Sequence, residues 1–277
     1  MTDPIWLKIA LSFLVGGVVV AGCTFAAERL GTDIGGIIGG FPSTIAVTLL
    51  FMALVVSPTA AAEATTMVPL IVGFNGAFLV GFALLVRRGL GLSLVGALSL
   101  WFVLSLTALQ LRLTNFIVFL STFVVMLFLG HYILYNRLKI PVYGSKRVVL
   151  ARRQLLTRAL VSGGVIAAAV YLSKVAGPVS GGVLSVFPAV FISTLIIVYR
   201  SNGADFARAL TRPLLTSGMV NVVAYAIAVR YFYPVWGITL GTLGAFVVAG
   251  MTAYGTYLVV RSPKSGLNKN GSKQTAP

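Results

Sequence analysis

Apolar runs of about 20 residues recur along most of this chain, and they restrict its fold more than any other feature of the sequence. A helix of that length crosses the hydrocarbon core of a bilayer, where backbone polar groups must be bonded within the protein. Hydrophobic residues make up 58% of the 277 residues and charged residues 9%. The sequence therefore predicts an all-α polytopic membrane protein whose main partner is the lipid bilayer.

Nine of these runs are long enough to span a membrane, and an odd number of spans places the two termini on opposite sides. The predicted spans lie near residues 6–28, 34–57, 67–86, 90–111, 114–135, 156–173, 177–199, 214–233 and 235–260. With the N-terminus outside, all but four of the 21 Lys and Arg residues fall on the cytoplasmic side. Because basic residues accumulate on that side, we predict a multi-pass plasma-membrane protein with an outer N-terminus and a cytoplasmic C-terminus.

One helix-breaking phrase occurs twice, as GGIIGGFP at 35–42 and as GGVLSVFP at 181–188, a spacing of 146 residues. Further identities at this spacing are Gly31 with Gly177, Thr48 with Thr194, and Asn75 with Asn221. Each phrase follows one span of its half, so the repeat unit is four spans, with a single span between the two units. That central span makes the units start on opposite sides of the membrane, as in the inverted repeats of many secondary transporters. Chance similarity between glycine-rich membrane helices is the alternative explanation.

The repeat predicts the organisation of the whole chain. We expect a first four-span repeat at 1–112, a linking span with a basic cytoplasmic loop at 113–158, a second, inverted repeat at 159–261 and a disordered cytoplasmic tail at 262–277. The connection 136–158 carries seven Lys and Arg residues, which either set the orientation or also bind anionic lipids. The oligomeric state stays open, and a homo-oligomer is one of the alternatives.

Glycine and proline in both phrases predict that spans 2 and 7 are discontinuous helices. Proline lacks an amide hydrogen and clashes with the carbonyl four residues back, so Pro42 frees the carbonyl of Ile38 and Pro188 that of Leu184. Each proline also fits the first turn of a half-helix, whose N-terminus carries partial positive charge. Two such termini at one site would attract an anionic or carbonyl-bearing solute, whereas freed carbonyls would attract a cation. Tight packing through glycines at four-residue spacing is the alternative.

Polar residues near the two phrases complete the candidate site. Asp33 precedes the first break, where a carboxylate would bind Na⁺ or a proton, or would lie at the membrane interface next to a helix start. Asn75 and Asn221 fall in spans 3 and 8 and would either line the site or hydrogen-bond another helix. The predicted substrate- or ion-binding residues are Asp33, Gly35, Gly36, Gly39, Gly40, Phe41, Pro42, Ser43, Asn75, Gly181, Gly182, Phe187, Pro188 and Asn221.

The sequence offers little for catalysis, metal binding or nucleic-acid binding. Its five acidic residues are too few and too scattered to hold Mg²⁺, and no HExxH, GxSxG or phosphate-binding loop occurs. The single cysteine, Cys23, permits no intramolecular disulfide and no cysteine metal cluster. We expect neither enzymatic activity nor a cofactor, a metal or a nucleic-acid partner.

The C-terminal half, about residues 157–261, resembles the small four-span inner-membrane proteins of the GlpM-like family. The resemblance lies in SGGVLSVFPAVFISTLII and in the short polar loop RSNGADFARA that follows. The N-terminal half matches more loosely through GGIIGGFPSTIAVTLL and reads SPTAAAEATT in place of the basic loop. The resemblance implies a fused inverted pair of units that elsewhere occur singly, and a loose association with exopolysaccharide production. It supplies no catalytic residues.

Two functions from different classes fit these features. The first is a secondary transporter or permease that alternates access around spans 2 and 7 and binds a small solute or ion near the midplane. The second is a non-transporting membrane scaffold or accessory subunit of an envelope or exopolysaccharide complex, in which the glycine faces contact other proteins.

Overall fold

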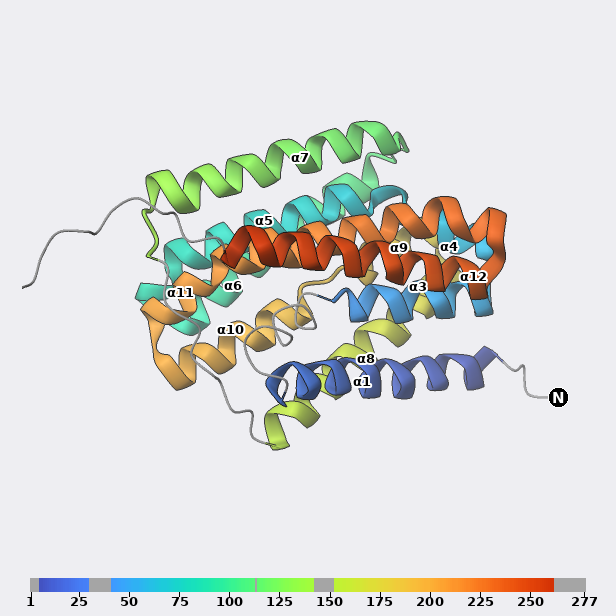
Figure 1. Ribbon diagram of the computed structural model, residues 1–277, viewed down its shortest axis with the longest axis horizontal. Coiled ribbons are helices and arrows are strands. Elements are labelled where there is room, and N and C mark those ends of the chain that lie inside the picture. The colour runs from blue at the N-terminus through green and yellow to red at the C-terminus, as the bar shows by residue number, and fades with distance from the viewer. Residues whose placement is uncertain (1–4, 30–40, 113, 142–151, 262–277) are drawn as a thin grey trace, which may run out of the picture.

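The computed structural model describes residues 5–29, 41–112, 114–141 and 152–261, and the regular structure in these ranges is helical (Figure 1). The α-helices are α1 (Ile5–Arg29), α3 (Ser43–Val55), α4 (Pro58–Ala64), α5 (Val68–Leu85), α6 (Leu90–Gln110), α7 (Phe116–Tyr132), α8 (Arg152–Val175), α9 (Pro178–Ser185), α10 (Ala189–Asn202), α11 (Ala204–Pro213) and α12 (Met219–Arg261). Two 3₁₀ turns, η1 (Thr65–Met67) and η2 (Val86–Arg88), and two π turns, η3 (Ile133–Arg137) and η4 (Leu214–Gly218), connect some of them.

Seven helices in the described ranges are long and apolar enough to cross a membrane, and Ser43–Val55 is a shorter apolar helix. One of the seven, Ala204–Leu258, has 55 residues, far more than the roughly 20 that one crossing needs. Gly237 interrupts it with a φ of 70° and a ψ of −173°, and Figure 1 shows the chain turning back there at one end of the bundle. The prediction of an all-α multi-pass membrane protein is confirmed.

Helices α1 and α8 run antiparallel and pack closely at glycines. A Cβ atom at Gly163 would lie 2.5 Å from the carbonyl oxygen of Phe13, and one at Gly17 would lie 3.0 Å from that of Ala159. Farther along the same pair, the rings of Trp6 and Tyr171 stack with centroids 5.8 Å apart. Small residues at a membrane-helix contact allow this close backbone approach, which adds dispersion contacts where there is no water to exclude.

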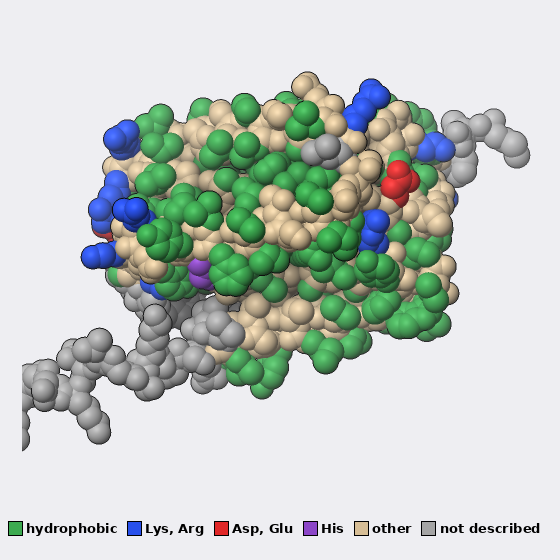
Figure 2. Space-filling view, turned by 90° about the horizontal axis from the view of Figure 1, so that it is seen from above, with side chains coloured by type: hydrophobic (Ala, Val, Ile, Leu, Met, Phe, Trp, Pro, Cys, Tyr) green, Lys and Arg blue, Asp and Glu red, His purple; other side chains and the backbone are tan. Residues whose placement is uncertain are grey.

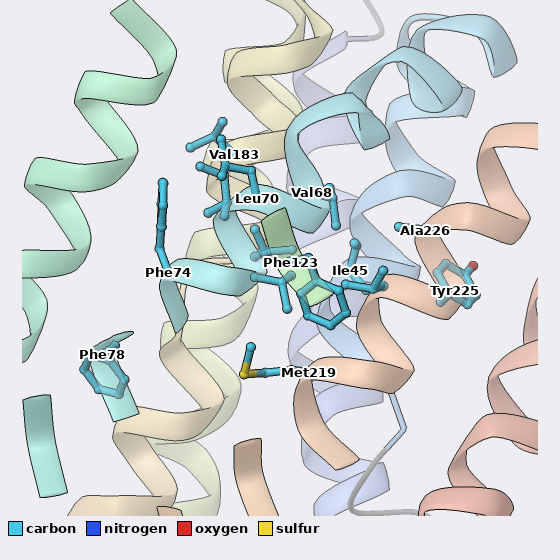
Figure 3. Close-up of a cluster of buried hydrophobic side chains, with 14 of the residues drawn as sticks. Ile45, Val68, Leu70, Phe74, Phe78, Phe123, Val183, Met219, Tyr225 and Ala226 are labelled. Carbon is cyan, nitrogen blue, oxygen red and sulfur yellow. The ribbon is translucent and has the colours of Figure 1, made fainter. Parts of the chain in front are cut away.

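The centre of the bundle is a cluster of buried apolar side chains. Figure 3 shows Phe78 of α5, Phe123 of α7, Met219 of α12 and Ile45 of α3 among the buried side chains that fill the space between these helices. Large hydrophobic side chains such as Phe128 also cover much of the outside, and Figure 2 shows them across the middle of one face. An apolar surface around an apolar core is what a surrounding bilayer requires.

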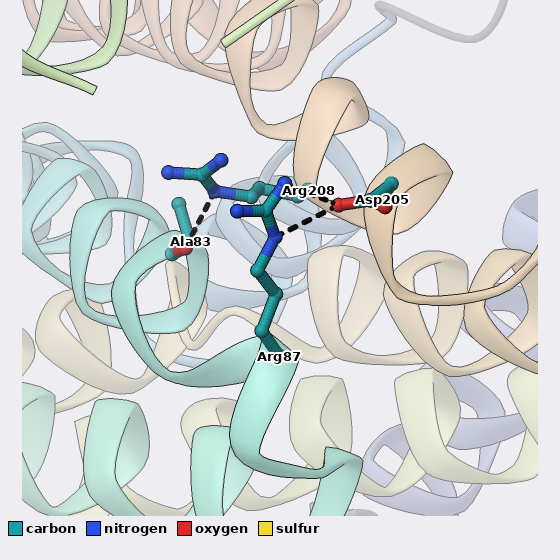
Figure 4. Close-up of polar contacts among 4 residues, drawn as sticks. All are labelled: Ala83, Arg87, Asp205 and Arg208. Atoms are coloured by element: carbon teal, nitrogen blue, oxygen red, sulfur yellow. Dashed lines mark hydrogen bonds and ion pairs between the residues drawn. The ribbon is translucent and has the colours of Figure 1, made fainter. Parts of the chain in front are cut away.

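Basic side chains hold the two ends of the bundle. At one end Arg87 of η2 pairs with Asp205 of α11 at 2.8 Å, and Arg208 Nε donates to the carbonyl oxygen of Ala83 at 3.0 Å (Figure 4). At the other end Lys8 Nζ donates to the carbonyl oxygen of Leu54 at 2.9 Å. Helix α1 starts at this second end, and the last stretch of α12 runs toward the first (Figure 1).

Candidate functional site

The first break lies directly before α3. Pro42 caps this helix with a φ of −79° and a ψ of 52°, outside the helical region. The Ser43 amide donates back to the Phe41 carbonyl at 2.8 Å, and the Ala46 amide donates to the Pro42 carbonyl at 3.0 Å. A tight turn is thus centred on Pro42, and regular helix begins at Ser43, because proline fits the start of a helix better than its interior.

The second break repeats this local geometry before α10. Pro188 caps the helix with a φ of −75° and a ψ of 35°. The Ala189 amide donates to the Phe187 carbonyl at 2.8 Å, and the Ile192 amide donates to the Pro188 carbonyl at 2.9 Å. The same two hydrogen bonds at the same places relative to proline therefore shape both breaks.

The side chain of Asn75 donates a hydrogen bond to the irregular backbone at the second break. It is 5% exposed, lies in α5, and donates from Nδ2 to the carbonyl oxygen of Val186 at 3.0 Å. Val186 follows the last residue of α9, so its carbonyl lies where the helical pattern has stopped. In a membrane interior a side-chain donor of this kind replaces the missing helical hydrogen bond.

Both breaks line one cavity of about 260 Å³. Its walls come from α1, the starts of α3 and α10, α5, α8, the π turn η4 and the start of α12. Six of the predicted residues line it, namely Phe41, Pro42, Ser43, Asn75, Phe187 and Pro188. Segments that are 146 residues apart in the sequence therefore meet at one cavity between helices.

Arg158 brings a full positive charge to this cavity and was missed as a site residue in the sequence. Its Nη2 donates to the Thr194 hydroxyl of α10 at 3.1 Å, while its buried Nε has no hydrogen-bond partner among the described residues. The sequence reasoning counted it with the basic loop 136–158, although the predicted span 156–173 already contains it. A basic residue inside a predicted span was the signal that could have found it.

The two phenylalanines that precede the prolines anchor the breaks to distant helices. The Phe41 ring stacks on Phe246 of α12 with centroids 5.2 Å apart. The Phe187 ring meets Trp101 of α6 edge to face at 5.3 Å. Each break is thus held by an aromatic side chain from the other part of the chain, and such pairs favour defined ring geometries.

The glycines of the second phrase are packing residues in α9 and do not line the cavity. A Cβ atom at Gly181 would lie 2.6 Å from the carbonyl oxygen of Ala169, and one at Gly182 would overlap the carbonyl oxygen of Ala64. The second glycine segment is therefore helical and tightly packed, which is the alternative that the sequence left open for it.

The remaining predicted residues are not brought to the cavity by the described structure. Asn221 is fully buried in α12 and is the neighbour of the lining residue Val222, but it does not line the cavity itself. Asp33, Gly35, Gly36, Gly39 and Gly40 lie outside the described residues.

Residues of the π turn η4 both line the cavity and make a polar contact with His131. Leu214, Ser217 and Gly218 of this turn line the cavity. Thr216, in the same turn, lies 3.0 Å from Nε2 of His131, the only histidine in the chain. A single π turn inserted between helices is frequent at functional sites, because it turns side chains out of the regular helical register.

A comparison with known families identifies part of the chain. A family model described as "Protein of unknown function (DUF3147)" matches residues 9–114, so this N-terminal part is a DUF3147 family domain. The match runs from α1 to just beyond α6 and includes the first break. Neither the curated proteins nor the solved structures include a match to the chain.

Proposed function

We propose that this protein is a secondary transporter or permease for a small solute or ion, and that it alternates access around the breaks before α3 and α10. The observation that carries the proposal is that both Phe-Pro turns line the same cavity. Irregular backbone at membrane depth is tolerated where it lines a cavity or is buried in protein, and transporters use such broken helices to bind their substrates.

Inverted duplication is part of the proposal, and the bounds of the helices support it. Shifting α1 by the 146-residue spacing gives 151–175, and α8 is Arg152–Val175. The same shift takes Ser43, the first residue of α3, to Ala189, the first residue of α10, and Pro58, the first of α4, to Ala204, the first of α11. On this proposal, residues 159–261 are a second, diverged copy of the DUF3147 domain, and the resemblance to GlpM-like proteins describes the same unit.

Contacts between the copies support the inverted arrangement. The contact of Phe13 with Gly163 becomes that of Ala159 with Gly17 when each residue is exchanged for its counterpart at the repeat spacing. A pair of contacts of this kind is expected when a two-fold axis relates two antiparallel helices. For an inverted repeat that axis lies in the membrane plane, which would place the cavity near the midplane.

The orientation in the membrane follows from charge. The end of the bundle with Arg87, Arg88 and Arg208 is the more basic in the sequence-based assignment, and we assign it to the cytoplasm of a plasma membrane. The start of α1 then faces outside. Anionic lipid at the basic connection 136–158 and a homo-oligomeric state remain parts of this proposal that need their own measurement.

The scaffold function is the second candidate, and it needs glycine faces that are free for other proteins. Gly181 and Gly182 are covered by α8 and α4 of the same chain, which supports an internal packing role. The transporter proposal accounts for the cavity, whereas a scaffold role gives no reason for one.

The decisive experiment measures flux through the purified full chain in sealed vesicles. Solutes and ions of both charges are screened with wild-type protein, and active ones are repeated with Pro42→Ala and Pro188→Ala. Alanine restores the amide hydrogen and removes the ring clash, so the broken helix can close, and we expect flux to fall at least about tenfold in each variant.

Pro58→Ala is the matched control, since Pro58 occupies the first turn of α4 and does not line the cavity. It should retain wild-type flux. Wild-type flux in both break variants, or no flux with any solute in wild type, would refute the transporter proposal.

A further inference from the structure

Among the described residues that line the cavity, the charge is carried by one side chain. Arg158 donates from Nη2 to Thr194 Oγ1 at 3.1 Å, and its buried Nε has no partner in the described ranges. The described lining includes no acidic side chain. A guanidinium at membrane depth is costly without a counter-charge, and such residues usually mark the path of a substrate or ion.

Two helix N-termini add partial positive charge to the same space. α3 has 13 residues and α10 has 14, and neither proline cap makes a side-chain hydrogen bond to its helix. Ser43 of α3 and Val190 of α10 line the cavity, so both first turns border it. Each N-terminus behaves as roughly half a positive charge, which favours a bound anion over a bound cation.

Asn75, which also lines the cavity, has a buried hydrogen-bond acceptor that restricts which anions would fit. Because Asn75 Nδ2 donates to the Val186 carbonyl, the orientation of the side-chain amide is determined. Its oxygen, Oδ1, is then the acceptor left to bind a ligand. This Oδ1 is buried and has no hydrogen-bond partner in the described structure. It can accept a hydrogen bond from an O–H or N–H group, which sulfate, chloride and simple carboxylates lack.

We propose that the cavity binds a small oxyanion that also carries an O–H or N–H donor. Arg158 and the two N-termini bind its anionic oxygens, and Asn75 Oδ1 accepts its donor hydrogen. The volume of about 260 Å³ lies just below the roughly 300–1,000 Å³ of sites for drug-sized ligands, so the solute is compact. Hydroxycarboxylates and hydrogen phosphate share this chemistry. The inference rests on the proposed transport site and names its substrate class.

Two matched pairs of sodium salts test this class by calorimetric titration of the detergent-purified full chain at constant ionic strength and neutral pH. Lactate differs from propionate by one hydroxyl group, and hydrogen phosphate differs from sulfate by its protons. In at least one pair we expect the donor-bearing anion to bind at least about tenfold more tightly than its partner, because a site with a buried acceptor discriminates against a ligand that leaves it unpaired. Equal binding within both pairs, or no binding of any of the four, overturns the proposal.

Variants of Arg158 test the residue assignment. Arg158→Gln should weaken binding of the preferred anion at least about tenfold, and Arg158→Lys should restore part of it, because the charge returns without the planar fork. Arg153→Gln removes an equal charge from an exposed position on the same helix and should bind as wild type. Wild-type affinity in Arg158→Gln, or an equal loss in Arg153→Gln, overturns the assignment.

The binding and flux measurements separate this inference from the transporter proposal. Anion binding that depends on Arg158, without flux of the same anion, supports the inference and refutes transport of that anion. Flux of a cation or neutral solute that is lost in Pro42→Ala and Pro188→Ala, with no anion bound, supports transport and overturns the inference.

Discussion

The two breaks have the same backbone turn but different chemical surroundings. At the second break, Arg158 contacts Thr194 and Asn75 bonds the irregular carbonyl of Val186. At the position 146 residues before Arg158 stands Ser12, which is fully buried and donates to the carbonyl of its own helix at Ile9. The two Phe-Pro turns thus share a backbone shape, while among the described residues that line the cavity only Arg158 carries a charge.

If the proposed duplication holds, this difference bears on how a duplicated unit acquires a function. Each copy would then contribute one helix N-terminus to a site between the copies. One arginine would be enough to favour an anionic ligand, whereas two arginines in so small a space would repel each other. On this proposal, the residues that differ between the copies carry more information about function than those that agree.

The largest expected effect is at the packed glycine of the second phrase. Gly182→Ala places a Cβ atom against the backbone carbonyl of Ala64, which a flexible side chain cannot relieve. We expect a loss of about 3 kcal/mol or more in the free energy of unfolding, seen as a lower midpoint in thermal unfolding of the purified protein.

Gly164→Ala is the matched control, since a Cβ atom at Gly164 would meet no atom within 4 Å. It should be neutral or stabilising by up to about 1 kcal/mol, through helix propensity. Gly36 stands at the corresponding place in the first phrase, so Gly36→Ala is the matching variant. An equal loss of stability in that variant would support the proposed correspondence between the two repeats. A Gly182→Ala protein as stable as wild type would contradict the packing role.

An intermediate effect is expected at the asparagine that serves the second break. Asn75→Leu keeps the branching of the side chain but leaves the Val186 carbonyl without its donor, so we expect a loss of about 1–3 kcal/mol in the free energy of unfolding. Thr48→Val is the comparison in α3, because the one hydrogen bond of the Thr48 hydroxyl among the described residues goes to the Thr44 carbonyl of its own helix at 2.8 Å. Its replacement should change stability by less than about 1 kcal/mol, since that carbonyl keeps its helical partner. Both free energies of unfolding are measured by chemical denaturation. Equal losses in the two variants would contradict a special role of Asn75 at the second break.

Much of the fold could be predicted from the sequence, because apolar length and proline chemistry act locally. Proline destabilises a helix interior and fits a helix start, and both α3 and α10 begin directly after the predicted proline. Arg158 could not be assigned by counting charges, since whether an arginine near a membrane surface points outward or into the bundle depends on the packing of α8. Lateral packing of this kind has no signal in hydropathy.

Asn221 shows why a repeat in sequence does not ensure a repeat of side-chain position. Asn75 follows a 3₁₀ turn, η1, whereas Asn221 follows a π turn, η4. A 3₁₀ turn tightens the helix and a π turn loosens it, so side chains beyond the two turns point in different directions. Asn75 lines the cavity and Asn221 does not, although the two share the spacing of 146 residues.

The smallest effect is expected at the ion pair between η2 and α11 at one end of the bundle. Arg87 and Asp205 are 64% and 60% exposed, so water and salt screen their 2.8 Å contact. A double-mutant cycle with Arg87→Gln and Asp205→Asn should give a coupling of about 0–1 kcal/mol, which shrinks further in high salt. The residue 146 positions before Asp205 is Thr59, so the charge pair has no counterpart at that position. A coupling free energy well above 1 kcal/mol would contradict the expected screening and would show that this ion pair stabilises the contact between η2 and α11.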